Sequence, residues 1–466
     1  MNPDYNAEGK CLLLPLRIND SSLPDIFTTG PTFKNQQASG LIPYIQLSTM
    51  RLKLSNIFAS SILFLCGMGA SSCSMVEEDR SDCPTGLFVR FVYDYNTMRA
   101  DMFKDHVGHV QVYVFDEKGR LAAERSVSNT DLNAPLSRYG YAMHFTPEEL
   151  PAGHSYRIQA VAMQRDWTDA LTTVGAKYRH SASPTEHSES LTISLDHHNL
   201  PIEGTQQYQV SDLAPLDTLW HTLKVIAHDP TETGAVPDID KTGKPYSIYP
   251  IEDQMVRLEK EHATYATVSL IRDTKHLNLT LRHVDDPETV YATDYEVKII
   301  DNNAHLSHDN TVLTHDSVRY SPYASWTSRL LDNNKVEIED IHMGNPGQYH
   351  APATRDLEEA GPPKVLQRTA HYNLMFNRLM FDTDDIKNNA LLEIHNKKTG
   401  KLVARVNLPY ILSQGRQAYE IQNYGHQEYL DREHDYELDF FLKGDSWISV
   451  EIHVLAWSKR IQNVEL

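Results

Sequence analysis

Cysteine is scarce in this chain, whose 466 residues include only four: Cys11, Cys66, Cys73 and Cys83. Positive charge is also in short supply, with 43 Lys and Arg residues against 63 Asp and Glu residues and a formal net charge of −20. This balance argues against nucleic acid and against electrostatic docking on an anionic membrane surface, because both partners require basic faces. No run of eighteen apolar residues occurs, so the sequence predicts no helix that spans a bilayer.

The segment before Cys73 has the features of a bacterial lipoprotein signal. A basic start at Met50-Arg51-Leu52-Lys53 precedes a short apolar stretch at residues 57–65, and the small residues Ala70-Ser71-Ser72 lead to Cys73. A charged start, an apolar stretch and a small-residue cleavage site together predict a secretory signal. A cysteine at the cleavage position takes a diacylglyceryl group on its thiol, so the mature chain is expected to begin with a lipid at Cys73.

Other interpretations of these cysteines stay open. A cysteine near an apolar stretch is most often a small buried side chain, and the leucine usual three positions before a lipidated cysteine is missing here. Cys66 is a poorer lipid site because the bulky Leu65 precedes it. With Cys73 lipidated, Cys83 has no partner that would staple the mature chain, so no disulfide framework is expected.

Residues 1–49 precede the signal and show no sustained period of either helix or strand. A signal peptide belongs at the amino terminus, so we interpret residues 1–49 as an upstream extension outside the mature protein. The alternative is a genuine amino-terminal arm, which would leave the signal internal. Residues 50–72 are then the signal peptide, and residues 73–85 form a lipidated tether.

Alternating apolar and polar residues recur along the mature sequence, and each such run predicts a strand with one buried face. Long helical patterns are scarce, and short helices are expected only near residues 147–150 and 409–413. An all-β chain of antiparallel β-sandwiches is the fold class that this pattern favours. The four clearest alternating runs are residues 110–114, 156–160, 277–281 and 450–454.

Two domains are expected, a β-sandwich at residues 86–245 and a second at residues 246–466. A stretch rich in Pro, Thr, Gly and Asp at residues 229–250 has the composition of a linker between them. A weak internal echo relates residues 112–121 to residues 297–306, and each copy predicts a strand, a tight turn and a returning strand. The echo is modest evidence for duplication.

The order of several segments resembles the fimbrial anchor lipoproteins of Bacteroidia, which include FimB-type and minor-fimbrium anchor subunits of type V pili. The resemblance extends from the signal to the last residue of the mature chain and leaves residues 1–49 outside it. The segments that carry it are Asp82-Cys83-Pro84 with residues 87–96, then residues 112–116 with Gly119, 268–274, 295–303, 320–323, 429–433, 440–442, Trp447 and 457–466.

The resemblance implies two transthyretin-like β-sandwiches in tandem, held at the outer membrane and cell surface by a lipid on Cys73. It also implies that the protein anchors a fimbrial shaft built by strand exchange, limits the length of that shaft, and is not an enzyme. The expected partners are the shaft subunits and, through the lipid, the outer membrane. The acidic run Glu77-Glu78-Asp79 resembles the signals that send such lipoproteins to the surface, and a solvated tether is an equal alternative.

The carboxy-terminal tail is a candidate partner strand. Ile461, Val464 and Leu466 give it an apolar side that would suit the open sheet edge of a neighbouring subunit. The alternative, which the residues favour somewhat, is the final strand of its own domain. A second functional reading is a fimbrial accessory or tip protein, or a surface adhesin that binds a host protein or glycan.

Residue patterns for catalysis or metal binding are missing. Among the 23 histidines, His305 with His308 and the pair His197-His198 are the closest groupings, and polar capping of a turn is the commoner role. No paired cysteines suit structural zinc, and no Gly-rich phosphate loop, HExxH or GxSxG pattern occurs. We therefore expect no metal, no cofactor and no small-molecule substrate. The tryptophans are expected in sandwich cores, with a sugar site as the alternative: Trp167, Trp220, Trp326, Trp447 and Trp457.

Overall fold

The computed structural model divides the chain into two compact units, one of residues 3–82 and one of residues 83–466 with the first two residues. In the smaller unit the described residues are two short strands, β1 (Asp4–Tyr5) and β2 (Cys11–Leu12), which pair antiparallel. In the larger unit the described residues are 85–130, 136, 141–165, 178–180, 187–195, 207–210, 215–228, 255–260, 262–313, 317–343, 363–383, 388–419, 422–454 and 457–462.

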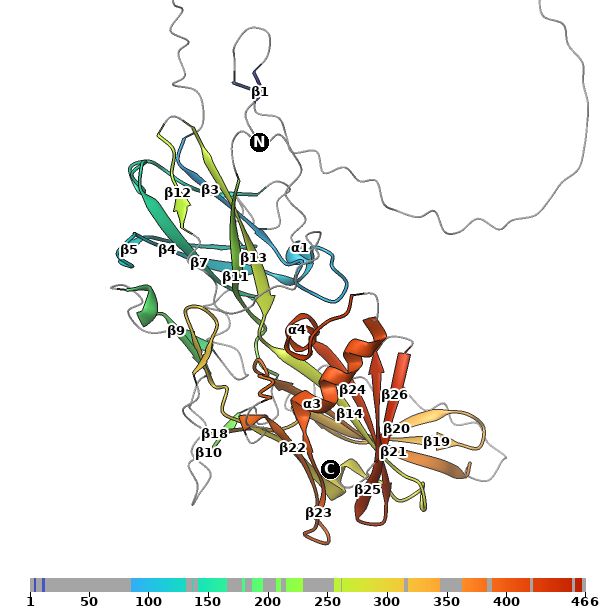
Figure 1. The fold of residues 1–466 in the computed structure, drawn as a ribbon. Helices are drawn as coiled ribbons and strands as arrows, with labels where there is room; N and C mark the ends of the chain where they lie inside the picture. Colours follow the sequence, from blue (N-terminus) through green and yellow to red (C-terminus); the bar gives the residue numbers. More distant parts are fainter. Residues whose placement is uncertain are drawn as a thin grey trace, which may run out of the picture. The chain divides into compact units, whose positions relative to one another are not determined.

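Strands dominate the larger unit (Figure 1), which confirms the expected all-β class. The first large sheet has the order β5 (Leu121–Ser128), β4 (His109–Phe115), β7 (Ser155–Met163), β11 (Leu219–His228), β13 (Thr264–Arg272), β3 (Leu87–Val92) and β6 (Met143–Phe145), with β12 (Val256–Arg257) paired to β7. The second has the order β20 (Val336–Met343), β19 (Ala324–Leu331), β21 (Val365–Phe376), β14 (Lys275–His283), β24 (Asp435–Lys443), β25 (Ser446–Val454) and β26 (Trp457–Gln462). We call these the eight-stranded and the seven-stranded sheet.

Two smaller sheets and a few short helices complete the described part. One sheet has the order β10 (Gln207–Val210), β18 (Ser317–Tyr320), β15 (Tyr295–Asp301), β22 (Leu391–Asn396) and β23 (Leu402–Asn407). The other has the order β17 (Val312–Leu313), β16 (His305–Ser307), β9 (Thr192–Leu195) and β8 (Tyr178–His180). The helices are α1 (Phe103–His106), α3 (Leu408–Ser413) and α4 (His426–Arg432), with 3-10 turns η2 (Ser188–Ser190), η3 (Ala292–Asp294) and η6 (Gln414–Tyr419).

The four alternating runs are all strands, namely β4, β7, β14 and β25. The expectation of one buried face was wrong for β4. Val112 and Val114 lie in one hydrophobic cluster, whereas Tyr113 and Phe115 lie in another. β4 is an inner strand between β5 and β7, so apolar side chains cover both of its faces. β7 is likewise buried on both faces over most of its length.

Strands pair across long stretches of sequence. Most pairs are antiparallel as expected, but β10 with β18, β3 with β13, and β14 with β24 are parallel. Strands on the two sides of residues 245/246 share sheets, as β11 and β13 do. The predicted linker, residues 229–250, lies outside the described residues. The division into two domains at that point, and the transthyretin-like arrangement, therefore stay predictions.

The prediction that residues 112–121 and 297–306 each form a hairpin was right for the first segment only. The first segment is a hairpin in which β4 pairs with β5 and the Gly119 N–H donates to the Asp116 carbonyl at 2.9 Å. The second segment is not a hairpin, because β15 and β16 lie in different sheets. Spacing alone could not distinguish a strand that returns to its neighbour from one that leaves for another sheet.

One of the two expected short helices is present. α3 begins after Asn407, whose side-chain oxygen accepts a hydrogen bond from the Tyr410 N–H at 2.9 Å and so caps the helix. The segment at residues 147–150 is not a helix. It is a single turn in which the Glu149 and Leu150 N–H groups donate to the Thr146 carbonyl at 3.1 and 2.9 Å.

Candidate functional site: a buried junction and two sheet edges

The chain crosses from the eight-stranded to the seven-stranded sheet in one short step. β13 ends at Arg272 and β14 begins at Lys275, so only Asp273 and Thr274 lie between them. Asp273, Thr274 and Lys275 are each 0% exposed. Buried polar groups are costly unless they are paired. These three residues and four others form one connected set of contacts, which we call the crossing network: Asp273, Thr274, Lys275, His221, Asn310, Arg378 and Asp431.

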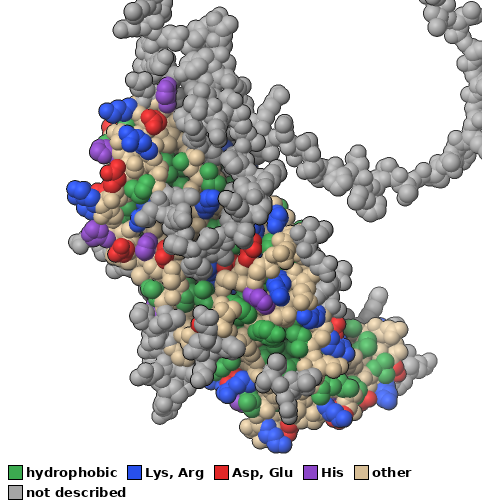
Figure 2. All heavy atoms as spheres, viewed as in Figure 1, with side chains coloured by type: hydrophobic (Ala, Val, Ile, Leu, Met, Phe, Trp, Pro, Cys, Tyr) green, Lys and Arg blue, Asp and Glu red, His purple; other side chains and the backbone are tan. Residues whose placement is uncertain are grey.

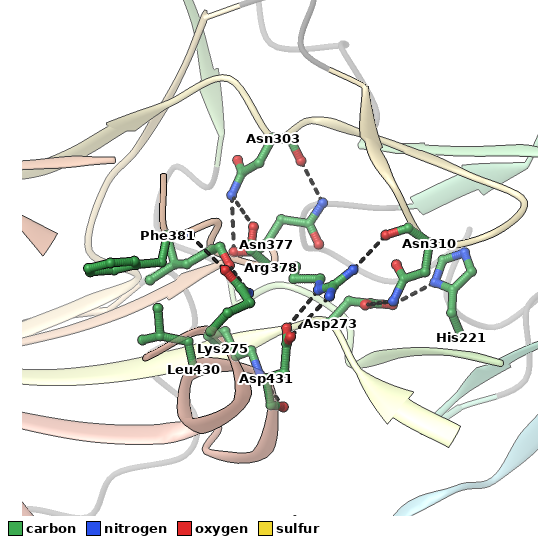
Figure 3. A network of polar contacts seen from close by, with 12 residues as sticks. His221, Asp273, Lys275, Asn303, Asn310, Asn377, Arg378, Phe381, Leu430 and Asp431 are labelled. Carbon is green, nitrogen blue, oxygen red and sulfur yellow. Dashed lines mark hydrogen bonds and ion pairs between the residues drawn. The ribbon is translucent and has the colours of Figure 1, made fainter. Parts of the chain in front are cut away.

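Asp273 is held by side chains from two other segments (Figure 3). Its Oδ2 lies 2.5 Å from Nδ1 of His221 on β11. Its Oδ1 accepts a hydrogen bond at 2.8 Å from the amide of Asn310, which follows β16. The backbone N–H of Asp273 donates to the Leu219 carbonyl at 2.9 Å. Both carboxylate oxygens are thus satisfied without water.

Thr274 ties the crossing to the start of β11. Its hydroxyl donates to the Asp217 carbonyl at 3.0 Å and accepts from the Leu219 N–H at 3.0 Å. The hydroxyl of Tyr178 on β8 lies 3.2 Å from the same oxygen. A valine here would have the same shape but would leave these groups unpaired.

Lys275 is a buried amine whose partners are backbone carbonyls. Its Nζ donates to the carbonyl of Asp431 at 2.9 Å and to that of Glu433 at 2.8 Å, at the end of α4. Burial lowers the pKa of the Lys275 ammonium to about 8, although the charge of Asp431 acts in the opposite direction. The side chain fastens β14 to the segment that leads into β24.

Arg378, just after β21, completes the network. Its Nε and Nη2 donate to the two oxygens of Asp431 at 2.7 and 3.0 Å, and its Nη1 donates to the Asn310 carbonyl at 2.6 Å. Both partners are fully enclosed. Two-point pairs of this kind fix the relative orientation of the groups that carry them.

A second set of contacts joins the segment after β3 to α4 and to the residues on either side of that helix. The guanidinium of Arg432 lies 4.0 Å from the centre of the Tyr95 ring, and Nε of Arg99 donates to the Tyr424 hydroxyl at 3.0 Å. The Thr97 hydroxyl donates to Glu433 at 3.3 Å. These residues are far apart in sequence, so the contacts are tertiary.

The acid–base groups of the junction are closed to solvent. His221 and Asp273 resemble the acid–base part of a hydrolase triad, but they are 2% and 0% exposed, so a substrate has no access to them. Within the described residues no group of three or more His, Cys, Asp or Glu side chains is arranged to hold a metal ion. His305 and His308 contact the hydroxyls of Ser194 and Ser307 at 2.7 and 3.0 Å.

The predicted anchor and partner-strand residues are placed only in part. Cys73, Val464 and Leu466 lie outside the described residues. Ile461 lies in β26, opposite Val450 of β25. This pairing matches the alternative in which the tail closes its own domain, and the donor-strand role of Ile461, Val464 and Leu466 stays a prediction.

The opposite edge of the seven-stranded sheet is a feature that sequence reasoning missed. Among the described strands, β20 ends that sheet and pairs on one side with β19. Val336, Ile338 and Ile341 on β20 are 65%, 44% and 39% exposed. The sequence contains the alternation Val336-Glu337-Ile338-Glu339, which indicates a strand. It does not indicate that the strand lies at the edge of a sheet.

The tryptophans are divided between core and surface. Trp220 and Trp447 are buried at 1% and 8% exposure, as expected for core residues. Trp326 on β19 is half-buried and stacks on His371 with ring centres 4.9 Å apart. Trp457 lies in β26, and Trp167 lies outside the described residues.

Comparisons with known proteins agree with this architecture. The sequence model of the family "Fimbrillin-A associated anchor proteins Mfa1 and Mfa2" matches residues 80–463. The minor fimbrium anchoring subunit Mfa2 of Porphyromonas gingivalis is 22% identical over 257 residues, which cover 50% of this chain and 77% of that protein.

Two crystal structures of Bacteroides thetaiotaomicron proteins share the fold. One, a proposed adhesin, has a TM-score of 0.55 at 20% identity and covers 82% of this chain and 99% of its own. The other, from a set of proposed polysaccharide-binding proteins, has a TM-score of 0.54 at 23% identity and covers 82% and 100%. Because the family match takes in most of the sequence, this chain belongs to the fimbrillin-A associated anchor proteins Mfa1 and Mfa2.

Proposed function

We propose that this protein is an outer-membrane lipoprotein that anchors a surface fimbria to the cell and limits its length. The observation that carries the proposal is the family match over residues 80–463. The all-β architecture, whose charged and polar groups are used to hold strands together, suits a mechanical role.

The lipid on Cys73 is the proposed attachment to the membrane. The family match begins at residue 80, seven positions after Cys73, which leaves a short tether between the lipid and the folded part. In the described part of the chain no helix has the length and hydropathy to cross a membrane. A diacylglyceryl group supplies two acyl chains, and each buried methylene contributes about 0.8 kcal/mol, so the attachment is stable.

The shaft subunits are the proposed partners, and the two edges of the seven-stranded sheet are the proposed contact sites. An edge strand presents N–H and C=O groups that an extended segment of another subunit can pair with. β20 adds the exposed Val336, Ile338 and Ile341, which would pack against such a segment. On the face shown in Figure 2, acidic and basic side chains are interspersed, so strand pairing rather than a field of one charge would select the partner.

The lipid claim is tested by labelling cells with a fatty-acid probe. Cys73→Ala should abolish labelling of the protein, whereas the matched variant Cys66→Ala should retain it. Undiminished labelling of Cys73→Ala refutes the lipid site. The partner claim is tested by purifying the native protein from outer membranes and identifying what comes with it; shaft subunits are expected.

A surface adhesin is the second candidate, because the structures that share the fold include a proposed adhesin. Genomic neighbourhood separates the two functions, since an anchor gene should lie beside genes for shaft subunits. Recovery of a host protein or glycan in place of shaft subunits would favour the adhesin.

A further inference from the structure

A two-residue crossing between large sheets is a natural place for a hinge. Hinges are a few loop or element-terminal residues that absorb large backbone rotations. Here both crossing residues, Asp273 and Thr274, are 0% exposed and hydrogen-bonded. We propose that the crossing network is a lock: it makes the eight-stranded and seven-stranded sheets open together, as one cooperative unit.

The network joins segments from widely separated parts of the sequence. His221 belongs to β11 of the eight-stranded sheet, and Lys275 begins β14 of the seven-stranded sheet. Asn310 follows β16, Arg378 follows β21, and Asp431 lies in α4. Asp273 contacts His221 and Asn310 directly, and the Asn310 carbonyl accepts a hydrogen bond from Arg378. Rotation at the crossing would break contacts on both sheets at once.

The charges of the network are balanced, which makes partial opening costly. The network holds the acids Asp273 and Asp431 and the cations Lys275 and Arg378, all nearly or completely inaccessible to solvent. Arg378 pairs with Asp431, whereas Asp273 and Lys275 are held by neutral hydrogen-bond partners and by His221. Separating one partner leaves the others as buried unpaired charges, which proteins tolerate poorly. The cheapest opening is therefore one that hydrates the whole network, and it releases both sheets.

A hydrophobic cluster lies across the same two sheets. Tyr113, Phe115 and Met163 of the eight-stranded sheet belong to one buried cluster with Leu277 and Leu279 of the seven-stranded sheet. Opening either sheet alone would expose apolar surface that belongs to the other. A locked junction would transmit tension between the two sheets without bending at the crossing. This mechanical property goes beyond the proposed attachment to the membrane.

Native-state hydrogen exchange on the full chain tests the lock. Amides of β11 and β24 should open with the same free energy and the same denaturant dependence, because one event exposes both. Two separate opening free energies in the wild-type protein would overturn the proposal.

Variants then test whether the network is the cause. Asp273→Asn should split the exchange into two events, with protection of one sheet falling about a hundredfold or more relative to the other. Should Asp273→Asn fail to fold, the milder Thr274→Val serves, with a split in the same direction. The control Lys398→Met removes the ion pair between the exposed Lys398 and the partly buried Asp294 and should leave a single event. Coincident opening of both sheets in the network variant would overturn the proposal.

Discussion

The guanidinium of Arg378 and the carboxylate of Asp431 form a two-point ion pair, with Nε–Oδ1 at 2.7 Å and Nη2–Oδ2 at 3.0 Å and side-chain exposures of 1% and 0%. Burial makes this pair different from the many ion pairs on the surface of the molecule. Removing either partner leaves the other as a buried, unpaired charge that water cannot solvate.

Arg378→Met should therefore lower the free energy of unfolding by about 3–5 kcal/mol, because Asp431 is left buried and unpaired. Urea denaturation of the full chain measures the change. Lys398→Met, which breaks the ion pair between the exposed Lys398 and the partly buried Asp294, should cost less than about 1 kcal/mol. Equal costs for the two variants would contradict the assignment of Arg378 to a buried network.

Asp301 should make stability depend on pH near neutrality. Burial raises the pKa of this carboxyl from 3.8 to about 7, and only the Asn302 N–H, donating at 2.8 Å, acts against it. The folded state thus binds a proton more tightly than the unfolded state does. The contribution of Asp301 to stability is full below about pH 4 and is lost as the pH rises through about 7.

Asp301→Asn removes this titration. The free energy of unfolding of the variant, relative to that of the wild type, should therefore increase as the pH rises from 5 to 8. Urea unfolding of both proteins at these two pH values gives the comparison. Parallel pH profiles would show that Asp301 does not carry the effect.

Gly86 is expected to resist substitution for two reasons. Its φ of +90° lies in the region that favours glycine, and an added Cβ would meet the Phe145 carbonyl oxygen at 2.3 Å, where β3 adjoins β6. Gly86→Ala should lower the unfolding free energy by about 2 kcal/mol or more. Gly400→Ala shares the positive φ, +71°, but its Cβ meets no atom within 4 Å, so it should cost about 1 kcal/mol. Thermal denaturation ranks the two, and a larger loss for Gly400→Ala would be inconsistent with the close contact.

Ile338 on the edge strand β20 is a test position for partner binding. Ile338→Lys should reduce recovery of shaft subunits with the protein about tenfold or more, without lowering stability, because the side chain is 44% exposed. Ile448→Lys is the matched control, since Ile448 is 38% exposed on the inner strand β25. Equal recovery with both variants would exclude the β20 edge as the contact site.

Local patterns predicted the parts of this fold that depend on local physics. The alternation at residues 277–281 survives in β14 because one face of that strand packs on the core while Asn278 on the other is half-buried. The cap at Asn407 and the turn that ends at Gly119 likewise depend on neighbours in sequence.

Local sequence patterns did not predict the contacts between residues far apart in the sequence. The parallel pairing of Thr264 with Leu87 joins segments far apart in sequence, and no local period encodes it. Lys275 was equally hidden, because a lysine beside an alternating strand usually marks a solvated face. Its burial depends on carbonyls supplied by Asp431 and Glu433, more than 150 residues away.

Cys73 gives the most direct test of the account, through the fraction of fimbriae that cells release into the medium. A deletion strain that carries the wild-type gene should keep its fimbriae on the cell, and one that carries Cys73→Ala should shed them. Fimbriae that stay equally attached in the Cys73→Ala strain would contradict a lipid-anchored role.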